Sequence, residues 1–318
     1  MQLLNYLINY KGEVIWMKES KLTFTAVVNL ISWNTLTASL FPVLIGAVFS
    51  DYYYHEVSIS KMIIYAIVAV TLHLIVNVLD NLDDYTVANQ EHADELLQIN
   101  PVHNFNLTKH QVKKVVTVML VIVVGLGLWL VQQTAWPLLV LGIIGLIVGL
   151  TYSKFFQNTP MGEILSGIIM GFLITFAAVY INTYQSFQWT WNGIWPSILI
   201  SLPNVFWIAN MMLANNICDI DYDKKCGRKT FPISVGKKNA IFTFNLLNVL
   251  AFIALILAVV LHFAPWTLLL TLILIPFVYQ QCKIFTEKQI KSSTFLAAVK
   301  ILGLGSLVQF ITFLIGLF

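Results

Sequence analysis

The sequence predicts an all-α protein that crosses a membrane about nine times, and three observations support this fold class. Of the 318 residues, 58% are hydrophobic and only 10% are charged, whereas a soluble domain is about 25% charged. The mean hydropathy is +0.80. The apolar runs are continuous and reach the ~20 residues that a bilayer core requires, which favours helices over the alternating strands of a barrel. The net charge of +3 is too small to indicate a nucleic-acid partner.

We expect one domain over residues 1–318, and the first span is long enough to include an interfacial turn. The expected spans lie at about residues 22–50, 60–84, 113–132, 136–154, 162–184, 193–217, 239–262, 265–282 and 294–318. Residues 1–21 lack the ordered regions of a cleavable signal and are predicted to be an amphipathic segment at the membrane interface, in preference to a disordered tail. The three cysteines fit neither a disulfide framework nor a four-ligand zinc site.

Positive charge is distributed unevenly among the connections. Lysine and arginine gather in the N-terminal segment and after the second, fourth, sixth and eighth spans, whereas the turns QQTAW, QSFQWTWNGIW and HFAPW contain none. The positive-inside rule therefore predicts a multi-pass protein of the plasma membrane with a cytoplasmic N-terminus and an external C-terminus. Segments 86–111 and 218–238 would be cytoplasmic loops that cap the bundle.

Two of the predicted spans end in acidic clusters on that same side. In NVLDNLDDY, one helical face carries Asn77, Asp80, Asn81 and Asp84. In NNICDIDYD, one face carries Asn215, Asn216, Asp219 and Asp223. Carboxylates this close repel one another, and the negative end of the helix dipole adds to the repulsion, so the clusters need cations. Carboxylate and amide oxygens without cysteine or histidine suit Mg²⁺, which shares its ligand shell with phosphate oxygens.

Basic residues lie close to these clusters in the sequence. Arg228, the single arginine of the chain, follows Asp223 by five residues with Lys229 beside it, and Lys154 ends the fourth span. Arginine binds phosphate through a planar fork and lysine as a point charge. The combination indicates a diphosphate bridged by magnesium, although ordinary positive-inside topology explains any single one of these cations.

The sequence resembles the UbiA superfamily of intramembrane prenyltransferases, and within it the branch that acts on 1,4-dihydroxy-2-naphthoate in menaquinone synthesis. NNICDIDYDKKCGRKTF is similar to that branch's second motif, NNxRDxxxDxxxGKxTL, with Cys218 in place of the usual arginine and Arg228 in place of the lysine. NTLTASLFPVLIGAVF and TYSKFFQNTPMGEILSGIIMG resemble its opening helix and its YTxGP…LGE segment. The first motif departs from the branch's NxxNDxxD, because its central pair is reversed as Asp80–Asn81.

The resemblance implies nine helices around a central cavity and a Mg²⁺-dependent prenyl transfer. Its implied metal ligands are Asp80, Asp84, Asp219 and Asp223. The implied substrate contacts are Asn77, Asn81, Asn215, Asn216, Arg228 and Lys229, and the implied catalytic residues are Lys154 and Tyr152 together with Asp84 and Asp219. The substrates would be a polyprenyl diphosphate and dihydroxynaphthoate, which loses its carboxylate to give demethylmenaquinone. Cations held in place would stabilise the charge that builds on the departing diphosphate.

Several alternatives remain open at this stage. Another acceptor of the same superfamily, 4-hydroxybenzoate or haem, is the nearest, and an ion-coupled transporter is a further one because intramembrane aspartates also mark ion pathways. His73 is better explained by packing than by base catalysis. Glu163 fits a helix-start carboxylate and an acceptor site equally well, and segment 86–111 fits a lid and a passive loop equally well. Prenyl chain length and oligomeric state are not encoded in these patterns.

Overall fold

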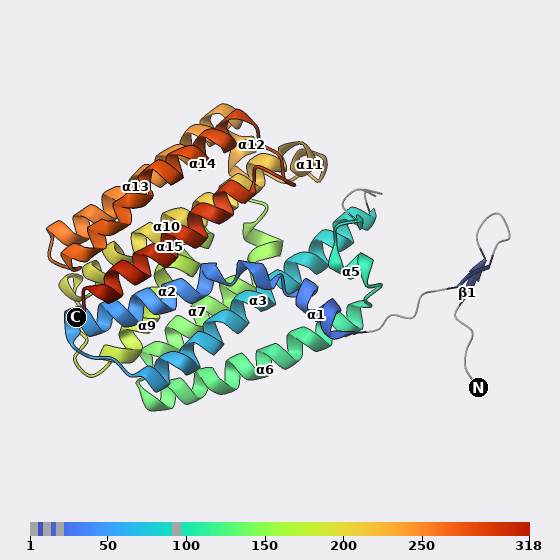
Figure 1. Ribbon diagram of the computed structural model, residues 1–318. Coiled ribbons are helices and arrows are strands. Elements are labelled where there is room, and N and C mark those ends of the chain that lie inside the picture. The colour runs from blue at the N-terminus through green and yellow to red at the C-terminus, as the bar shows by residue number, and fades with distance from the viewer. Residues whose placement is uncertain (1–5, 9–13, 17–21, 91–96) are drawn as a thin grey trace.

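The computed structural model describes residues 22–90 and 97–318, together with the backbone of residues 6–8 and 14–16 (Figure 1). The predicted interfacial segment 1–21 therefore lies largely outside the described residues. Its two described pieces, β1 (Tyr6–Ile8) and β2 (Val14–Trp16), pair antiparallel with Tyr6 opposite Trp16.

All other described elements are helical. In chain order they are α1 (Phe24–Leu30), η1 (Trp33–Thr35), α2 (Thr37–Phe49), η2 (Ser50–Tyr54), α3 (Ile59–Gln90), α5 (Pro101–Asn104), α6 (Lys109–Gln133), α7 (Pro137–Thr151), η3 (Tyr152–Phe156), α8 (Gly162–Ser166), η4 (Gly167–Leu173), α9 (Ile174–Thr183), α10 (Trp191–Cys218), α11 (Ile220–Lys225), α12 (Phe231–Val235), α13 (Lys237–Val260), η5 (Trp266–Leu274), α14 (Ile275–Glu287) and α15 (Leu296–Ile315).

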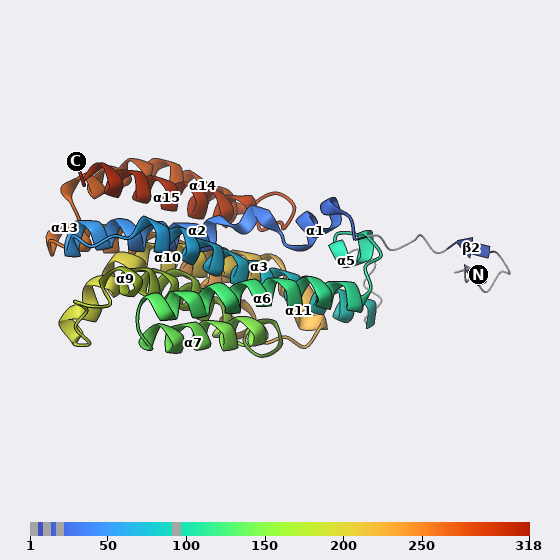
Figure 2. The same ribbon diagram turned by 90° about the horizontal axis from the view of Figure 1, so that it is seen from below.

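The predicted all-α membrane fold is confirmed. Within the described ranges, nine helices are long and apolar enough to cross a bilayer, and the side chains facing outward from α6, α7 and α13 are largely exposed apolar residues. Figures 1 and 2 show these helices running along one long axis, with α1, α5, α11 and α12 gathered at one end. We call this end of the bundle the site end.

Two boundaries differ from the sequence prediction. The second span continues as helix α3 to Gln90, so residues 86–90 of the predicted cap loop are helical. The remainder of that loop contains α5, and residues 91–96 lie outside the described residues, so a lid role there stays a prediction. The second predicted cap loop, 218–238, contains the short helices α11 and α12.

The turn expected within the first span is present at Ser32. This residue has a left-handed backbone conformation with φ 50° and separates α1 from η1. The chain then continues as α2, whose buried face packs against α9 and α15. The break brings the start of the first span against α3 at the site end.

Close backbone contact joins the middle of the bundle. A Cβ atom on Gly167 would lie 2.5 Å from the carbonyl oxygen of Val205, and one on Gly171 would lie 2.6 Å from its nitrogen. Only glycine permits this approach of η4 to α10 without displacement of one helix. The contact fixes the position of α10, which carries the second acidic cluster.

Candidate active site

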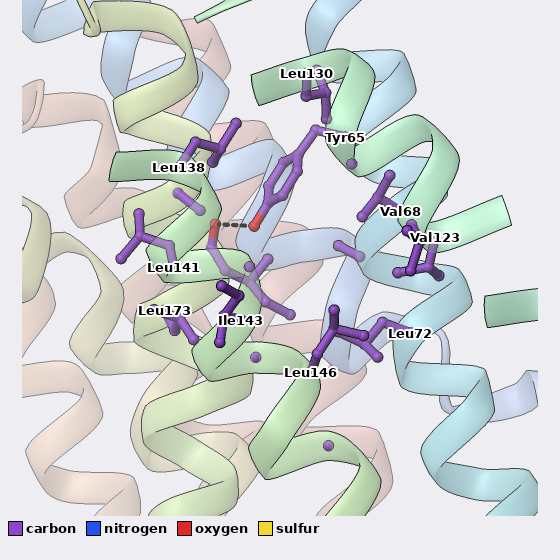
Figure 3. Close-up of a pocket in the computed structure, with 18 of the residues that line it drawn as sticks. Tyr65, Val68, Leu72, Val123, Leu130, Leu138, Leu141, Ile143, Leu146 and Leu173 are labelled. Carbon is purple, nitrogen blue, oxygen red and sulfur yellow. Dashed lines mark hydrogen bonds between the residues drawn. The ribbon is translucent and has the colours of Figure 1, made fainter. Parts of the chain in front are cut away.

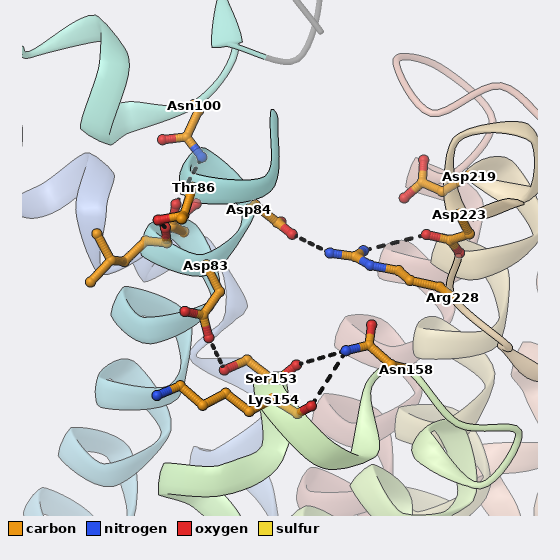
Figure 4. Close-up of polar contacts among 12 residues, drawn as sticks. Asp83, Asp84, Thr86, Asn100, Ser153, Lys154, Asn158, Asp219, Asp223 and Arg228 are labelled. Atoms are coloured by element: carbon orange, nitrogen blue, oxygen red, sulfur yellow. Dashed lines mark hydrogen bonds and ion pairs between the residues drawn. The ribbon is translucent and has the colours of Figure 1, made fainter. Parts of the chain in front are cut away.

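The first acidic cluster lies in the last third of α3, within a continuous helix. Arg228 donates to Oδ1 of Asp84 at 2.8 Å, and the Ser153 hydroxyl donates to Oδ2 of Asp83 at 2.6 Å. The helix therefore points Asp83 toward η3 and Asp84 toward the second cluster, as Figure 4 shows. This divergence follows from the 100° between successive residues of a helix.

The two asparagines of this cluster hold the first span in place. Nδ2 of Asn77 donates to the carbonyl oxygen of Ile31 at 3.0 Å and to Oγ1 of Thr35 at 2.9 Å. Nδ2 of Asn81 donates to the carbonyl oxygen of Leu30 at 2.9 Å. Carbonyl groups at the end of a helix lack partners inside it, and these amides supply them. Both predicted substrate contacts thus bind the main chain at the α1–η1 break.

His73, one turn earlier on α3, is a packed residue. It is buried, and Nδ1 lies 3.0 Å from Oγ of Ser39. Its position agrees with the packing role that the sequence favoured.

The second acidic cluster surrounds the break between α10 and α11. Nδ2 of Asn215 donates to Oδ2 of Asp219 at 3.3 Å. The ammonium of Lys291, in the connection between α14 and α15, donates to the same oxygen at 2.5 Å and also binds Oδ1 of Asn215. Asp223, on α11, is buried.

Arg228 joins the two clusters. Besides its bond to Asp84, its Nη1 donates to Oδ1 of Asp223 at 3.3 Å. Figure 4 shows the guanidinium between the two carboxylates, one from α3 and one from α11. The structure therefore brings the two acidic helix tips together at one end of the bundle, across an arginine with a 13% exposed side chain.

Burial and charge act against each other at this bridge. Asp223 is only 1% exposed, and this burial raises the pKa of its carboxyl to about 6, although Arg228 acts to lower it. Burial lowers the pKa of Arg228, but the carboxylates of Asp84 and Asp223 outweigh it and hold the pKa above its usual value. The guanidinium also lies over the ring of Tyr222, with 5.6 Å from Cζ to the ring centre.

Two buried carboxylate oxygens near the acidic clusters are unpaired within the described residues. Among the described residues, neither Oδ1 of Asp80 nor Oε2 of Glu163 has a hydrogen-bond partner. Buried polar atoms are nearly always paired in native structures, so each such atom calls for an explanation. The other oxygen of Glu163 accepts from Nδ2 of Asn216 at 2.8 Å and from the main-chain nitrogen of Phe231 at 3.3 Å, which fastens α8 to α10 and α12.

The donor set fits Mg²⁺. In the described part of the chain, no three histidine, cysteine, aspartate or glutamate side chains are close enough to enclose one ion. Magnesium, however, is commonly held by one or two carboxylates and completed by water and phosphate oxygens. Asp80, Asp84, Asp219 and Asp223 supply carboxylates of this kind, and a free buried oxygen on Asp80 is available to such a ligand.

The structure does not bring the predicted lysines to the carboxylates. Figure 4 shows Lys154 extending away from Arg228, on the far side of Ser153. Lys229 contributes its main-chain nitrogen, which donates to the carbonyl oxygen of Asn158 at 3.2 Å. Both side chains are exposed, and within the described ranges neither has an ion pair. Tyr152 is buried and donates its hydroxyl to the carbonyl oxygen of Gly162 at 3.0 Å.

The contact of Lys291 with the second cluster was not predicted from the sequence. Lysines after the eighth span indicated topology, and nothing in the local pattern relates residue 291 to residue 219. The nearest available signal is positional, because the eighth span ends on the same side as the second and sixth.

An apolar cavity of about 190 Å³ lies between α3, α6, α7 and η4 (Figure 3). Aliphatic side chains such as Leu72, Leu146 and Leu173 line it, and the Tyr65 hydroxyl at its edge donates to the carbonyl oxygen of Ile174 at 3.0 Å. His73 and Val76 line its inner end, and Val76 is one helical turn before Asp80. The cavity therefore approaches the first acidic cluster along α3.

The protein family to which the chain belongs is shown by its match to a family profile. The profile of the UbiA prenyltransferase family matches residues 39–304. The chain belongs to this family and is an integral membrane prenyltransferase.

A more particular likeness is found among characterised relatives. The chain is 26% identical over 270 residues to the 1,4-dihydroxy-2-naphthoate octaprenyltransferase of Bacillus subtilis (strain 168), covering 83% of each chain. Among solved structures, it superposes on a UbiA homologue from Aeropyrum pernix K1 with a TM-score of 0.68 and 19% identity, covering 86% of this chain and 97% of that one. A UbiA homologue from Archaeoglobus fulgidus bound to GPP and Mg²⁺ gives a TM-score of 0.62 at 15% identity, covering 92% and 99%.

Proposed function

We propose that this protein transfers a polyprenyl group from polyprenyl diphosphate to 1,4-dihydroxy-2-naphthoate, with loss of the acceptor's carboxylate, to give demethylmenaquinone. The observation that carries the site assignment is the Arg228 bridge between Asp84 and Asp223. It places carboxylates from two helices, and a cation between them, at one end of an apolar bundle. The likeness to the Bacillus subtilis enzyme and the second motif support the choice of acceptor.

Diphosphate binding is assigned to the two acidic tips acting through magnesium. Asp80, Asp84, Asp219 and Asp223 would hold the metal, which neutralises the charge of the diphosphate and of its leaving form. Arg228 already lies between two of these carboxylates and would donate to a diphosphate oxygen. Because charge on the diphosphate grows as its C–O bond breaks, groups fixed in this position stabilise the transition state more than the bound substrate.

The prenyl chain is assigned to the apolar cavity. Its inner end reaches the turn of α3 that precedes Asp80. On its outer side, Leu128, Leu139 and Ile143 line the cavity and are 48%, 40% and 45% exposed. These residues belong to α6 and α7, whose outer faces would contact lipid, so a long tail would extend from the cavity into the bilayer. Apolar walls would also keep water away from the allylic cation.

The orientation follows from the charge pattern of the connections. We infer a plasma-membrane protein whose N-terminus and site end face the cytoplasm and whose C-terminus is outside. Arg228 and Lys291 lie in connections, after α11 and after α14, and pair with carboxylates of the two acidic tips, and Lys154 ends the fourth span.

A transfer assay with the purified protein in detergent tests the proposal. Polyprenyl diphosphates of several lengths are offered with 1,4-dihydroxy-2-naphthoate or 4-hydroxybenzoate, with and without Mg²⁺, and products are measured by mass spectrometry. We expect prenylated, decarboxylated naphthoquinol that depends on Mg²⁺ and is lost in Asp219→Asn. Asp221→Asn is the matched control, because Asp221 lies two residues from Asp219 and is exposed on α11. Transfer to 4-hydroxybenzoate alone would refute the proposed acceptor.

A further inference from the structure

The connection between α14 and α15 places one cation directly on the second acidic cluster. The ammonium of Lys291 binds Oδ2 of Asp219 at 2.5 Å and Oδ1 of Asn215, and it lies 5.3 Å from the ring centre of Phe295. The side chains of Lys291 and Asp219 are 41% and 26% exposed. Among the residues that the structure describes, Lys291 is the one basic side chain that forms an ion pair with Asp219.

The connection holds its shape by its own hydrogen bonds. The main-chain nitrogens of Ser293, Thr294 and Phe295 all donate to the carbonyl oxygen of Ile290, at 3.2, 2.9 and 3.1 Å. The nitrogen of Ile290 donates in turn to Oγ1 of Thr294 at 2.7 Å. This tight turn presents Lys291 at the site end, so its side chain can leave the carboxylate by rotation while the turn stays folded.

Lys291 uses oxygens that a magnesium ion would also need. An ammonium and a divalent cation held by the same carboxylate repel each other. A metal that binds Oδ2 of Asp219 therefore competes with the ammonium for this oxygen. The Lys291 ammonium has three hydrogen-bond donors on a flexible side chain. Once displaced, it would still lie beside the second acidic cluster, where a diphosphate would bind.

We propose that Lys291 is a tethered counter-ion for the second acidic cluster, which Mg²⁺ displaces and which then binds an oxygen of the prenyl diphosphate. The inference rests on the proposed function, because it takes Asp219 as a metal ligand. It assigns two roles to Lys291, which change the affinity for the metal and the affinity for diphosphate in opposite directions. Before substrate arrives Lys291 competes with the metal, and once metal and substrate are bound it strengthens the hold on diphosphate.

Two affinities measured on the full-length protein in detergent micelles separate these roles. Mn²⁺ serves as the probe for the metal alone, with free Mn²⁺ followed by electron paramagnetic resonance. Geranyl diphosphate is titrated by calorimetry at saturating Mg²⁺ without an acceptor. In Lys291→Gln we expect Mn²⁺ to bind about 3- to 10-fold more tightly, as for loss of a partly exposed competing ion pair. Geranyl diphosphate should bind about 10-fold more weakly, through loss of a charge-assisted hydrogen bond.

Lys288→Gln is the matched control. It removes the same charge from the same connection, and within the described residues the exposed Lys288 side chain has no hydrogen bond or ion pair. It should leave both affinities within about 2-fold of wild type. Lys291→Arg keeps the charge and should retain most of the competition with Mn²⁺.

The inference is overturned if Lys291→Gln binds Mn²⁺ no more tightly than wild type, or if its affinity for geranyl diphosphate is unchanged. If Lys291 only stabilised the fold, Lys291→Gln would bind both Mn²⁺ and geranyl diphosphate more weakly. Opposite changes in the two affinities would exclude that role. Prenyl transfer by the wild-type protein is measured in parallel. Transfer with unaltered affinities in Lys291→Gln refutes only the role of Lys291, whereas a wild-type protein that binds no Mn²⁺ refutes the proposed function as well.

Discussion

Replacing Arg228 with glutamine removes the cation that joins the two acidic helix tips. Asp223 would then be left 1% exposed without its guanidinium partner, and Asp84 would lose its bond across the site. Removal of one member of a buried ion pair costs ~3–5 kcal/mol, because the remaining charge stays buried. Asp84 is 42% exposed, so its half of the bridge contributes under ~1 kcal/mol. We therefore expect the free energy of unfolding to fall by about 3 kcal/mol.

Reversible unfolding in mixed detergent and dodecyl sulfate micelles measures this change. Lys229→Gln, beside Arg228 and exposed, is the control and should unfold as wild type does. The double variant Arg228→Gln with Asp223→Asn should recover at least half of the loss, since both members of the pair have become neutral. Equal stability of Arg228→Gln and wild type, or a double variant less stable than the single one, would refute the reasoning.

Three further predictions concern packing, ligand geometry and metal. Gly171→Ala should lower the free energy of unfolding by about 1–3 kcal/mol in the same assay, because the added Cβ would lie 2.6 Å from the Val205 nitrogen; Gly142→Ala, with nothing within 4 Å, should not. Asp84→Asn should slow prenyl transfer by at least ~100-fold, whereas Asp83→Asn, whose carboxylate is bound to Ser153, should slow it less than ~10-fold, and equal losses would contradict the assigned geometry. Chelation with EDTA should abolish transfer and added Mg²⁺ should restore it, so full activity after exhaustive chelation would exclude the metal-held diphosphate.

The helix face on which each aspartate lies was predictable from the sequence, because helical spacing alone determines it. Asp80 and Asp84 share a face of α3, and Asp83 diverges from Asp84 toward Ser153, as 100° per residue requires. The span positions followed from apolar runs in the same way. The helical extension of α3 to Gln90 was missed, because polar residues beyond a membrane span carry no hydropathy signal that separates helix from loop.

The contacts that assemble the site could not be predicted, because they join distant segments. Arg228 and Asp84 are 144 residues apart in the sequence, and Lys291 and Asp219 are 72 apart. The direction of Lys154 depends on the π-helical segment η3, in which the 3.6-residue spacing used to place side chains no longer holds. Hydrophobic patterning therefore locates the helix tips, whereas tertiary packing decides which charges meet.

The Arg228 bridge also has a consequence for how the chain is made. Synthesis delivers Asp84 to the membrane 144 residues before its guanidinium partner leaves the ribosome. Until then the nascent first half carries an uncompensated anionic tip, which must remain in contact with water or solvated cations. Only the second half of the chain supplies the guanidinium that pairs with Asp84, so the candidate site is assembled late, when both halves are in place.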